Sequence, residues 1–130
     1  VLKVSGIDGP VPLLSMGDGM GRLLQLVLSA LRAGDGFLLV DEIENGLHFS
    51  VQERVWDVLF VLSGRYGMQV FATTHSSDCV RAFSNASRRH QKLDGKLLHM
   101  DRLEANGEAV VSVMSEGALS DLIDASVEVR

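Results

Sequence analysis

The first strong periodicity along the chain is helical. Apolar residues recur three and four positions apart, and polar residues fill the positions between them, so the segment has two distinct faces. The apolar positions are Leu23, Leu24, Val27, Leu28 and Leu31. Glycines follow in segment 33–36, and glycine is favoured where a helix ends. The pattern predicts a helix that, with the glycine-rich segment before it, spans residues 14–33.

Two short apolar runs predict buried strands. Residues 37–40 are Phe-Leu-Leu-Val and precede two acids, and residues 70–73 are Val-Phe-Ala-Thr and precede a Thr-His pair. Continuous apolar runs of this length are typical of strands buried on both faces, as in parallel sheets. With the polar residues at their ends, they predict strand units over 37–42 and 69–75.

Helices are predicted on either side of the second strand. The segment after Ser50 has apolar residues at helical spacing, and Ser50 with Glu53 fits a capping box at its start. Gly67 follows the end of this pattern. A shorter helix is predicted over 77–83, and the polar, basic segment 84–92 is expected to form an exposed loop.

The two ends of the chain add β-structure. Residues 1–4 indicate a short strand, and residues 6–12 contain both prolines and predict a loop. An Asn-Gly pair at 106–107 separates two strand-like runs and predicts a hairpin over 97–114. A short helix is predicted over 117–125. The fold class is therefore α/β, with parallel strands and crossover helices followed by a C-terminal β-hairpin and a short helix.

The composition limits the range of functions. The chain has 130 residues, a formal net charge of -5 and a pI near 5.2, which argues against nucleic-acid binding through bulk charge. The single cysteine, Cys79, excludes an internal disulfide and a cysteine zinc site, and we expect a buried thiol in a cytoplasmic protein. No apolar run is long enough to cross a bilayer, so no membrane partner is expected. The first residues resemble the middle of a strand, and we expect the chain to begin inside a longer protein.

Three residues suited to nucleotide chemistry follow the two predicted strands. Asp41 and Glu42 end the first strand and His75 ends the second, and parallel strands joined by a helix end at the same edge of the sheet. One carboxylate there can hold Mg²⁺ through its water shell, and a second can orient or deprotonate an attacking water. A neutral histidine opposite can hydrogen-bond a γ-phosphate. The alternative is a pair of ordinary surface carboxylates at a strand end.

A glycine-rich segment precedes the first helix. Residues 14–21 are Leu-Ser-Met-Gly-Asp-Gly-Met-Gly. Glycine allows close backbone approach, and a helix N-terminus offers free N–H groups. Together with the hydroxyl of Ser15, the segment is suited to contact a phosphate. An ordinary turn that caps a helix fits the same residues.

These segments together resemble the motifs of ABC-type ATPases, in the order that the family has them. Residues 14–18 resemble the signature motif, 37–42 the Walker B strand, 44–48 the D-loop and 70–76 the H-loop. The runs Asp-Glu-x-Glu-Asn-x-Leu-His and Thr-Thr-His-Ser are similar to the RecF/SMC-like, non-transporter branch. Within that branch they resemble the AAA-family ATPases related to overcoming-lysogenization-defect proteins.

The resemblance implies an ATP-binding and ATP-hydrolysing head that uses Mg²⁺. Asp41 would support the ion, Glu42 would be the general base, and His75 would be the γ-phosphate switch. The residues that would contact ATP are Ser15, Met16, Gly17, Asp18, Gly19 and Asn45. The signature residues would act on nucleotide bound by the other protomer of a head-to-tail homodimer, with the D-loop along the interface.

Other parts of such a head are missing from the sequence. It contains no Gly-x-x-x-x-Gly-Lys-Ser/Thr P-loop, and no Q-loop can be assigned. Both would lie in an N-terminal lobe, which makes this chain the C-terminal lobe of the head, and it should not bind ATP well alone. Ile43 and Phe49 stand where this branch often has proline.

Two other functions fit the same residues. One is a regulatory or docking lobe that pairs with a separate P-loop subunit. The other is a metal-dependent nuclease that uses Asp41, Glu42 and His75. DNA is a further candidate partner, through a group of basic residues for which a solvated loop is the simpler interpretation. That group is Arg81, Arg88, Arg89 and Lys92.

Overall fold

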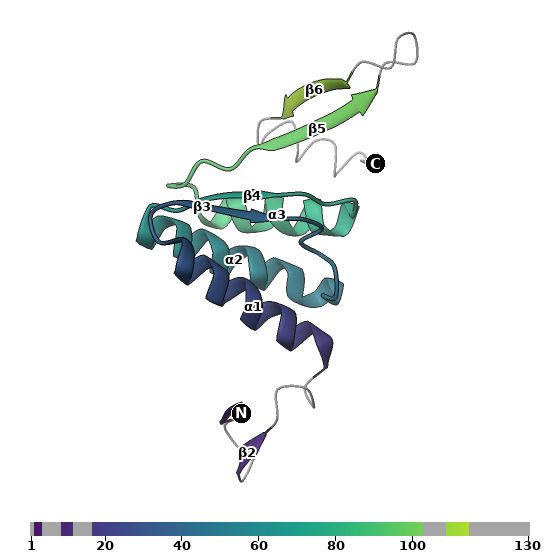
Figure 1. Ribbon diagram of the computed structural model, residues 1–130. Helices are drawn as coiled ribbons and strands as arrows, with labels where there is room; N and C mark the ends of the chain where they lie inside the picture. The colour runs from purple at the N-terminus through teal and green to yellow at the C-terminus, as the bar shows by residue number, and fades with distance from the viewer. Residues whose placement is uncertain (1, 4–8, 12–16, 103–108, 115–130) are drawn as a thin grey trace.

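The computed structural model describes residues 2–3, 9–11, 17–102 and 109–114. Their strands and helices are β1 Leu2–Lys3, β2 Pro10–Val11, α1 Asp18–Ala33, β3 Phe37–Val40, α2 Phe49–Tyr66, β4 Gln69–Ala72, α3 Ser77–Arg89, β5 Leu97–Arg102 and β6 Ala109–Met114. Helices α1 and α2 lie along one side of β3 and β4, and the hairpin of β5 and β6 lies on the other side (Figure 1).

The first two strands form a short antiparallel pair, with Leu2 opposite Val11 and Lys3 opposite Pro10. The loop predicted over 6–12 is therefore wrong at Pro10–Val11. Proline has no N–H to donate to a sheet, but it is tolerated in a short edge strand.

Helix α1 begins earlier than its apolar pattern. Asp18 is its first residue, so Gly19 and Gly21 lie within its first turns and not in a loop before it. The helix ends at the predicted place, and Gly34 follows it with a φ of 59°. Leu26 and Ala30 are buried in the core.

The parallel pair β3–β4 is the centre of the fold. The four residues of β3 pair in register with the four of β4, and α2 connects the strands, which confirms the predicted parallel arrangement. The prediction of burial on both faces is wrong for the described residues. Leu38 and Val40 are buried, whereas Phe37 is 66% and Leu39 75% exposed, because the helices cover only the opposite face.

The two ends of α2 differ in how well the sequence predicted them. Its N-cap is His48, not Ser50, and the Nδ1 atom of His48 accepts a hydrogen bond from the backbone N–H of Ser50 at 3.4 Å. Glu53 lies inside the helix and pairs with Arg89 at 2.6 Å instead of completing a capping box. Gly67 follows the helix in a left-handed conformation, as predicted.

Helix α3 is longer than predicted. It continues to Arg89 through the segment expected to be an exposed loop, and it packs against α2. Ala86 and Ser87 in that segment are buried, and the ring of Phe83 meets Trp56 edge-on at 5.0 Å. The residues that this segment buries are small, and two of them, Ser84 and Ser87, are polar. The sequence pattern therefore did not indicate that one side of the segment faces the core.

Strands β5 and β6 confirm the predicted hairpin. They pair antiparallel from Leu97 opposite Met114 to Arg102 opposite Ala109. Within the described residues the hairpin shares no strand pairing with β3 and β4. The predicted turn at 106–107 and the helix predicted over 117–125 lie outside the described residues.

Candidate functional site

The candidate site lies at the edge where β3 and β4 both end. The backbone N–H of Thr73 donates to the carbonyl of Val40 at 2.9 Å, and the N–H of Ile43 donates to the carbonyl of Thr73 at 3.0 Å. The ladder thus continues one residue past β4 and places Asp41 and Glu42 beside Thr73. The predicted strand units, 37–42 and 69–75, therefore each consist of a strand and the first loop residues that follow it.

Asp41 is held by two other elements. The hydroxyl of Thr73 donates to Oδ1 of Asp41 at 2.5 Å, and the guanidinium of Arg22 on α1 donates to the backbone carbonyl of Asp41 at 3.3 Å. The Nε atom of Arg22 is buried and has no hydrogen-bond partner among the described residues. Of the two carboxylate oxygens of Asp41, only Oδ1 accepts a hydrogen bond from the described part of the chain. Carboxylate oxygens are suitable ligands for Mg²⁺ or for its water shell.

Glu42 has an unusual backbone conformation. Its φ is 46°, in the left-handed region that a residue with a Cβ rarely adopts. Its backbone N–H donates to the hydroxyl oxygen of Thr73 at 2.8 Å, and its side chain is exposed. Strained residues of this kind persist where the surrounding structure holds them, and they concentrate at functional sites.

His75 is tied to the loop that follows the acid pair. Its backbone N–H donates to Oε1 of Glu44 at 2.9 Å, across 31 positions of sequence. The other carboxylate oxygen of Glu44, Oε2, is buried and has no hydrogen-bond partner in the described part of the chain. The imidazole of His75 is exposed. The structure thus brings Asp41, Glu42 and His75 to one edge.

The segment 44–48 meets the start of α1. The N–H of Asn45 donates to the carbonyl of Glu42 at 2.9 Å, and Gly46 has a φ of 73°. A Cβ placed on Gly19 would lie 3.1 Å from the carbonyl oxygen of Gly46. Only a residue without a side chain therefore allows this approach of the two backbones without displacement.

The predicted phosphate-contacting residues are only partly described. Ser15 and Met16 lie outside the described residues. Gly17, with a φ of 83°, stands at the N-terminus of α1 and provides no side-chain cap, and Asp18 and Gly19 form the first turn. Free N–H groups at a helix N-terminus are suited to anions. The structure therefore joins Gly17, Asp18 and Gly19 to the same region as Asn45.

Sequence reasoning missed two residues of this site, Thr73 and Glu44. Both make side-chain hydrogen bonds across the edge, one to the acid pair and one to the histidine loop. The available signal was the Thr-Thr pair before His75 and the further acid two positions after Glu42. Neither is informative without the register that places the two strand ends together.

Two residues of the basic group, Arg88 and Arg89, have side-chain partners. Arg89, from the basic group, donates to Glu53 and Asp57 on α2. Burial raises the pKa of the Cys79 thiol, although hydrogen bonds with Thr74 and Trp56 act to lower it. No group of three or more potential metal ligands is found in the part of the chain that the structure describes. No helix within the described ranges is long and apolar enough to cross a membrane.

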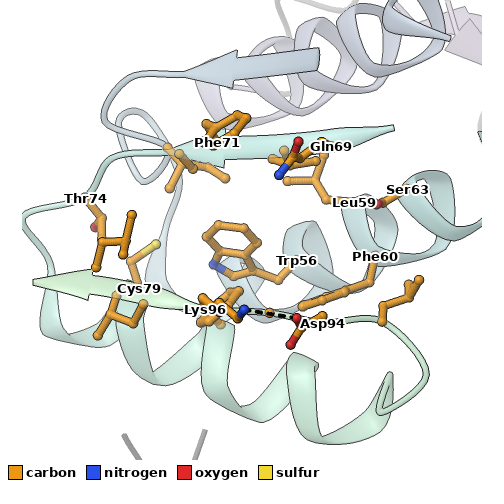
Figure 2. Close-up of a pocket in the computed structure, with 18 of the residues that line it drawn as sticks. Trp56, Leu59, Phe60, Ser63, Gln69, Phe71, Thr74, Cys79, Asp94 and Lys96 are labelled. Atoms are coloured by element: carbon orange, nitrogen blue, oxygen red, sulfur yellow. Dashed lines mark ion pairs between the residues drawn. The ribbon is translucent and has the colours of Figure 1, made fainter. Parts of the chain in front are cut away.

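A large apolar pocket lies beside this edge but is not part of it. Its volume is about 510 Å³, and it is bordered by β4, α2, α3 and the segment that leads into β5. Figure 2 shows Trp56 in its middle, below β4, and the ion pair of Lys96 and Asp94 at its rim, where Nζ and Oδ2 are 3.3 Å apart. None of Asp41, Glu42 and His75 lines it.

Similarity to known proteins is found at the level of a domain family and of one curated protein. The family described as "AAA domain, putative AbiEii toxin, Type IV TA system" matches residues 2–78, which include Asp41, Glu42 and His75. A Helicobacter pylori protein named "ATP/GTP phosphatase" is 34% identical over 90 residues, covering 67% of this chain and 24% of that protein. The chain thus spans about a quarter of the length of this curated relative. No solved structure matches the chain.

Proposed function

The chain belongs to this AAA-domain family of AAA/ABC-like P-loop ATPases, and from that premise we propose that it is the C-terminal lobe of a non-transporter, ABC-type ATPase head. The observation that supports this most directly is the meeting of Asp41, Glu42 and His75 at one sheet edge. The hydroxyl of Thr73 holds the first two, and the carboxylate of Glu44 holds the backbone of the third.

Each of these three residues has a distinct task in ATP hydrolysis. Asp41 supports Mg²⁺, and the fit rests on an exposed carboxylate with only one oxygen engaged by the described residues. Bound Mg²⁺ supplies charge neutralisation for the phosphates. Glu42 orients the attacking water and accepts its proton, and His75 hydrogen-bonds the γ-phosphate. Phosphoryl transfer depends mainly on positioning and charge stabilisation, so few groups suffice.

The uncovered face of the sheet supports a second lobe. Phe37 and Leu39 on β3 and Phe71 on β4 are exposed, with the rings of Phe37 and Phe71 6.1 Å apart. Parallel sheets are usually covered on both faces. We propose that an N-terminal lobe with the P-loop covers this face, because the sequence itself contains no P-loop.

The contact between α1 and the D-loop supports a head-to-tail homodimer. Gly17, Gly19 and Asn45 lie on neighbouring segments, as the approach of Gly19 to Gly46 shows. We propose that this combined surface, with Ser15, Met16 and Asp18, contacts ATP held by the other protomer. A docking lobe for a separate P-loop subunit is the second candidate function, because the exposed sheet face fits a lobe from either source.

Calorimetry of Mg²⁺-ATP binding tests the assignment. It compares the 130-residue chain with the longest natural reading frame that contains it. We expect binding by the longer protein only, because the P-loop must come from elsewhere. Tight binding by the short chain alone would contradict the proposed division into two lobes. Binding by neither protein, restored by adding a separate P-loop subunit, would favour the docking lobe.

A further inference from the structure

We propose that Thr73 is a positioning residue for hydrolysis, and that its hydroxyl sets both carboxylates of the acid pair. The proposal rests on the function proposed above. Thr73 was not among the residues expected from the sequence, and it lies one position beyond the end of β4.

The hydroxyl of Thr73 uses its donor and its acceptor capacity on neighbouring residues. It donates to Oδ1 of Asp41 at 2.5 Å and accepts from the backbone N–H of Glu42 at 2.8 Å. A hydroxyl is one of the few side-chain groups that can do both through a single atom. The backbone of Thr73 adds two hydrogen bonds, to Val40 and from Ile43. One residue just beyond β4 thereby holds four consecutive residues, from Val40 at the end of β3 to Ile43.

The hydrogen bond to Asp41 fixes the side chain that would support the ion. A hydroxyl that donates to an ionised carboxylate forms a short, charge-assisted hydrogen bond. It restricts the rotation of the carboxylate and occupies Oδ1, which leaves the other oxygen for the ion or its water shell. Residues that orient a metal ligand in this way commonly affect metal affinity and activity without touching the metal.

The hydrogen bond from Glu42 holds a backbone that would otherwise relax. With a φ of 46°, Glu42 occupies a conformation that persists only when its surroundings enforce it. The N–H of Glu42 has the hydroxyl of Thr73 as its acceptor. Without that acceptor, Glu42 can return to an ordinary φ, and its carboxylate would then point elsewhere.

The test measures ATP hydrolysis by the longest natural reading frame while the concentrations of Mg²⁺ and ATP are varied. Thr73→Val removes the hydroxyl at nearly constant shape, and Thr73→Ser keeps it. We expect Thr73→Val to lower kcat about 10- to 100-fold and to raise the Mg²⁺ concentration for half-maximal rate, with a smaller change in KM for ATP. Thr73→Ser should recover most of both losses.

Two further variants complete the experiment. Ser63→Ala removes another hydroxyl, which donates to the carbonyl of Met68 at the opposite end of β4 from Thr73, and should keep wild-type kcat and Mg²⁺ dependence. Thr73→Ala replaces Thr73→Val if the valine variant does not fold. Wild-type kcat and Mg²⁺ dependence in Thr73→Val, or equal losses in Thr73→Ser, would overturn the role of the hydroxyl alone. Absence of hydrolysis by the wild-type protein would overturn the proposed function and this role with it.

Discussion

The backbone N–H of His75 and the carboxylate of Glu44 are joined by a hydrogen bond of 2.9 Å, although the residues are 31 positions apart. This contact connects the loop after β3 with the loop after β4. It fixes the backbone of the residue expected to contact the γ-phosphate, while leaving its imidazole exposed. The two loops are therefore in direct contact through this hydrogen bond.

Removing the acceptor should impair turnover. We expect Glu44→Ala to lower kcat for ATP hydrolysis about tenfold, because a supporting residue is lost and the backbone of His75 becomes free to move. Glu44→Gln keeps an acceptor oxygen and should retain more activity than Glu44→Ala. Steady-state kinetics of the longest natural reading frame provide the measurement, and equal activity of the two variants would contradict a role for this hydrogen bond.

Glu42 should be necessary for hydrolysis and dispensable for binding. Glu42→Gln preserves shape but cannot accept a proton from water. We expect ATP binding near the wild-type level by calorimetry, with turnover reduced to background. Normal turnover in this variant would rule out Glu42 as the general base.

The backbone strain at Glu42 gives an independent prediction about stability. Glu42→Gly and Glu42→Ala both remove the carboxylate, but only glycine adopts a positive φ without steric cost. We expect Glu42→Gly to be the more stable variant by about 0.5–1 kcal/mol, because alanine has the steric cost of the positive φ and glycine does not. The difference is smaller than that steric cost, because glycine loses more conformational entropy on folding than alanine does. Urea unfolding of the two variants measures the difference, and a more stable alanine variant would show that the φ of 46° is not strained.

Two glycines of α1 form a matched pair for testing the contact with the segment 44–48. A Cβ on Gly21 would meet no atom within 4 Å, whereas one on Gly19 would lie 3.1 Å from the carbonyl oxygen of Gly46. Gly21→Ala should therefore stabilise the protein by up to about 1 kcal/mol through helix propensity. Gly19→Ala should gain less and should lower ATPase activity by displacing the loop. Equal stability and activity of the two variants would indicate that the approach of Gly19 to Gly46 has no consequence.

Local patterns predicted the parallel strand pair, the β-hairpin and the convergence of Asp41, Glu42 and His75. These depend on apolar runs, an Asn-Gly turn signal and the common edge of parallel strands, all of which are visible in short segments. The ATP-contacting roles of Ser15, Met16, Gly17, Asp18, Gly19 and Asn45 stay predictions.

The errors share a physical cause, which is that tertiary contacts are absent from local patterns. Residues 84–89 of the predicted loop are helical because α3 packs against α2 and buries small residues such as Ala86, although the composition of the segment is polar. The cap of α2 is an exception with a local cause, because the imidazole nitrogen of His48 accepts the hydrogen bond from the backbone N–H of Ser50. Thr73 and Glu44 gained their roles only from the register of two strands distant in sequence.

The ion pairs between α2 and α3 should make the free energy of unfolding depend on pH in the acidic range. Asp57 accepts hydrogen bonds from Arg89, at 2.9 Å to the nearer nitrogen, and contacts the ring of His90 at 3.1 Å. Burial acts to raise the pKa of Asp57, but the hydrogen bonds and charges of Arg89 and His90 outweigh it and lower that pKa below its usual value. The Arg89 pKa is raised, chiefly by its hydrogen bond with Asp57. The carboxylate is thus stabilised in its charged form in the folded state.

The sign of the pH effect follows from this direction. Since the folded state has the lower pKa, the contribution of Asp57 to the free energy of unfolding is complete above the unfolded value of about 3.9 and is lost as pH falls through the folded value. We expect Asp57→Asn to destabilise the protein by about 0.5–1 kcal/mol at pH 7, a range reduced by solvent screening, and by less near pH 2. Asp94→Asn is the control, because its partner Lys96 and Asp94 itself are largely exposed, with 63% and 83% of their side chains accessible. Urea unfolding between pH 7 and pH 2 provides the comparison. A difference in the free energy of unfolding between Asp57→Asn and the wild type that stayed constant from pH 7 to pH 2 would contradict a stabilising role for the charge of Asp57.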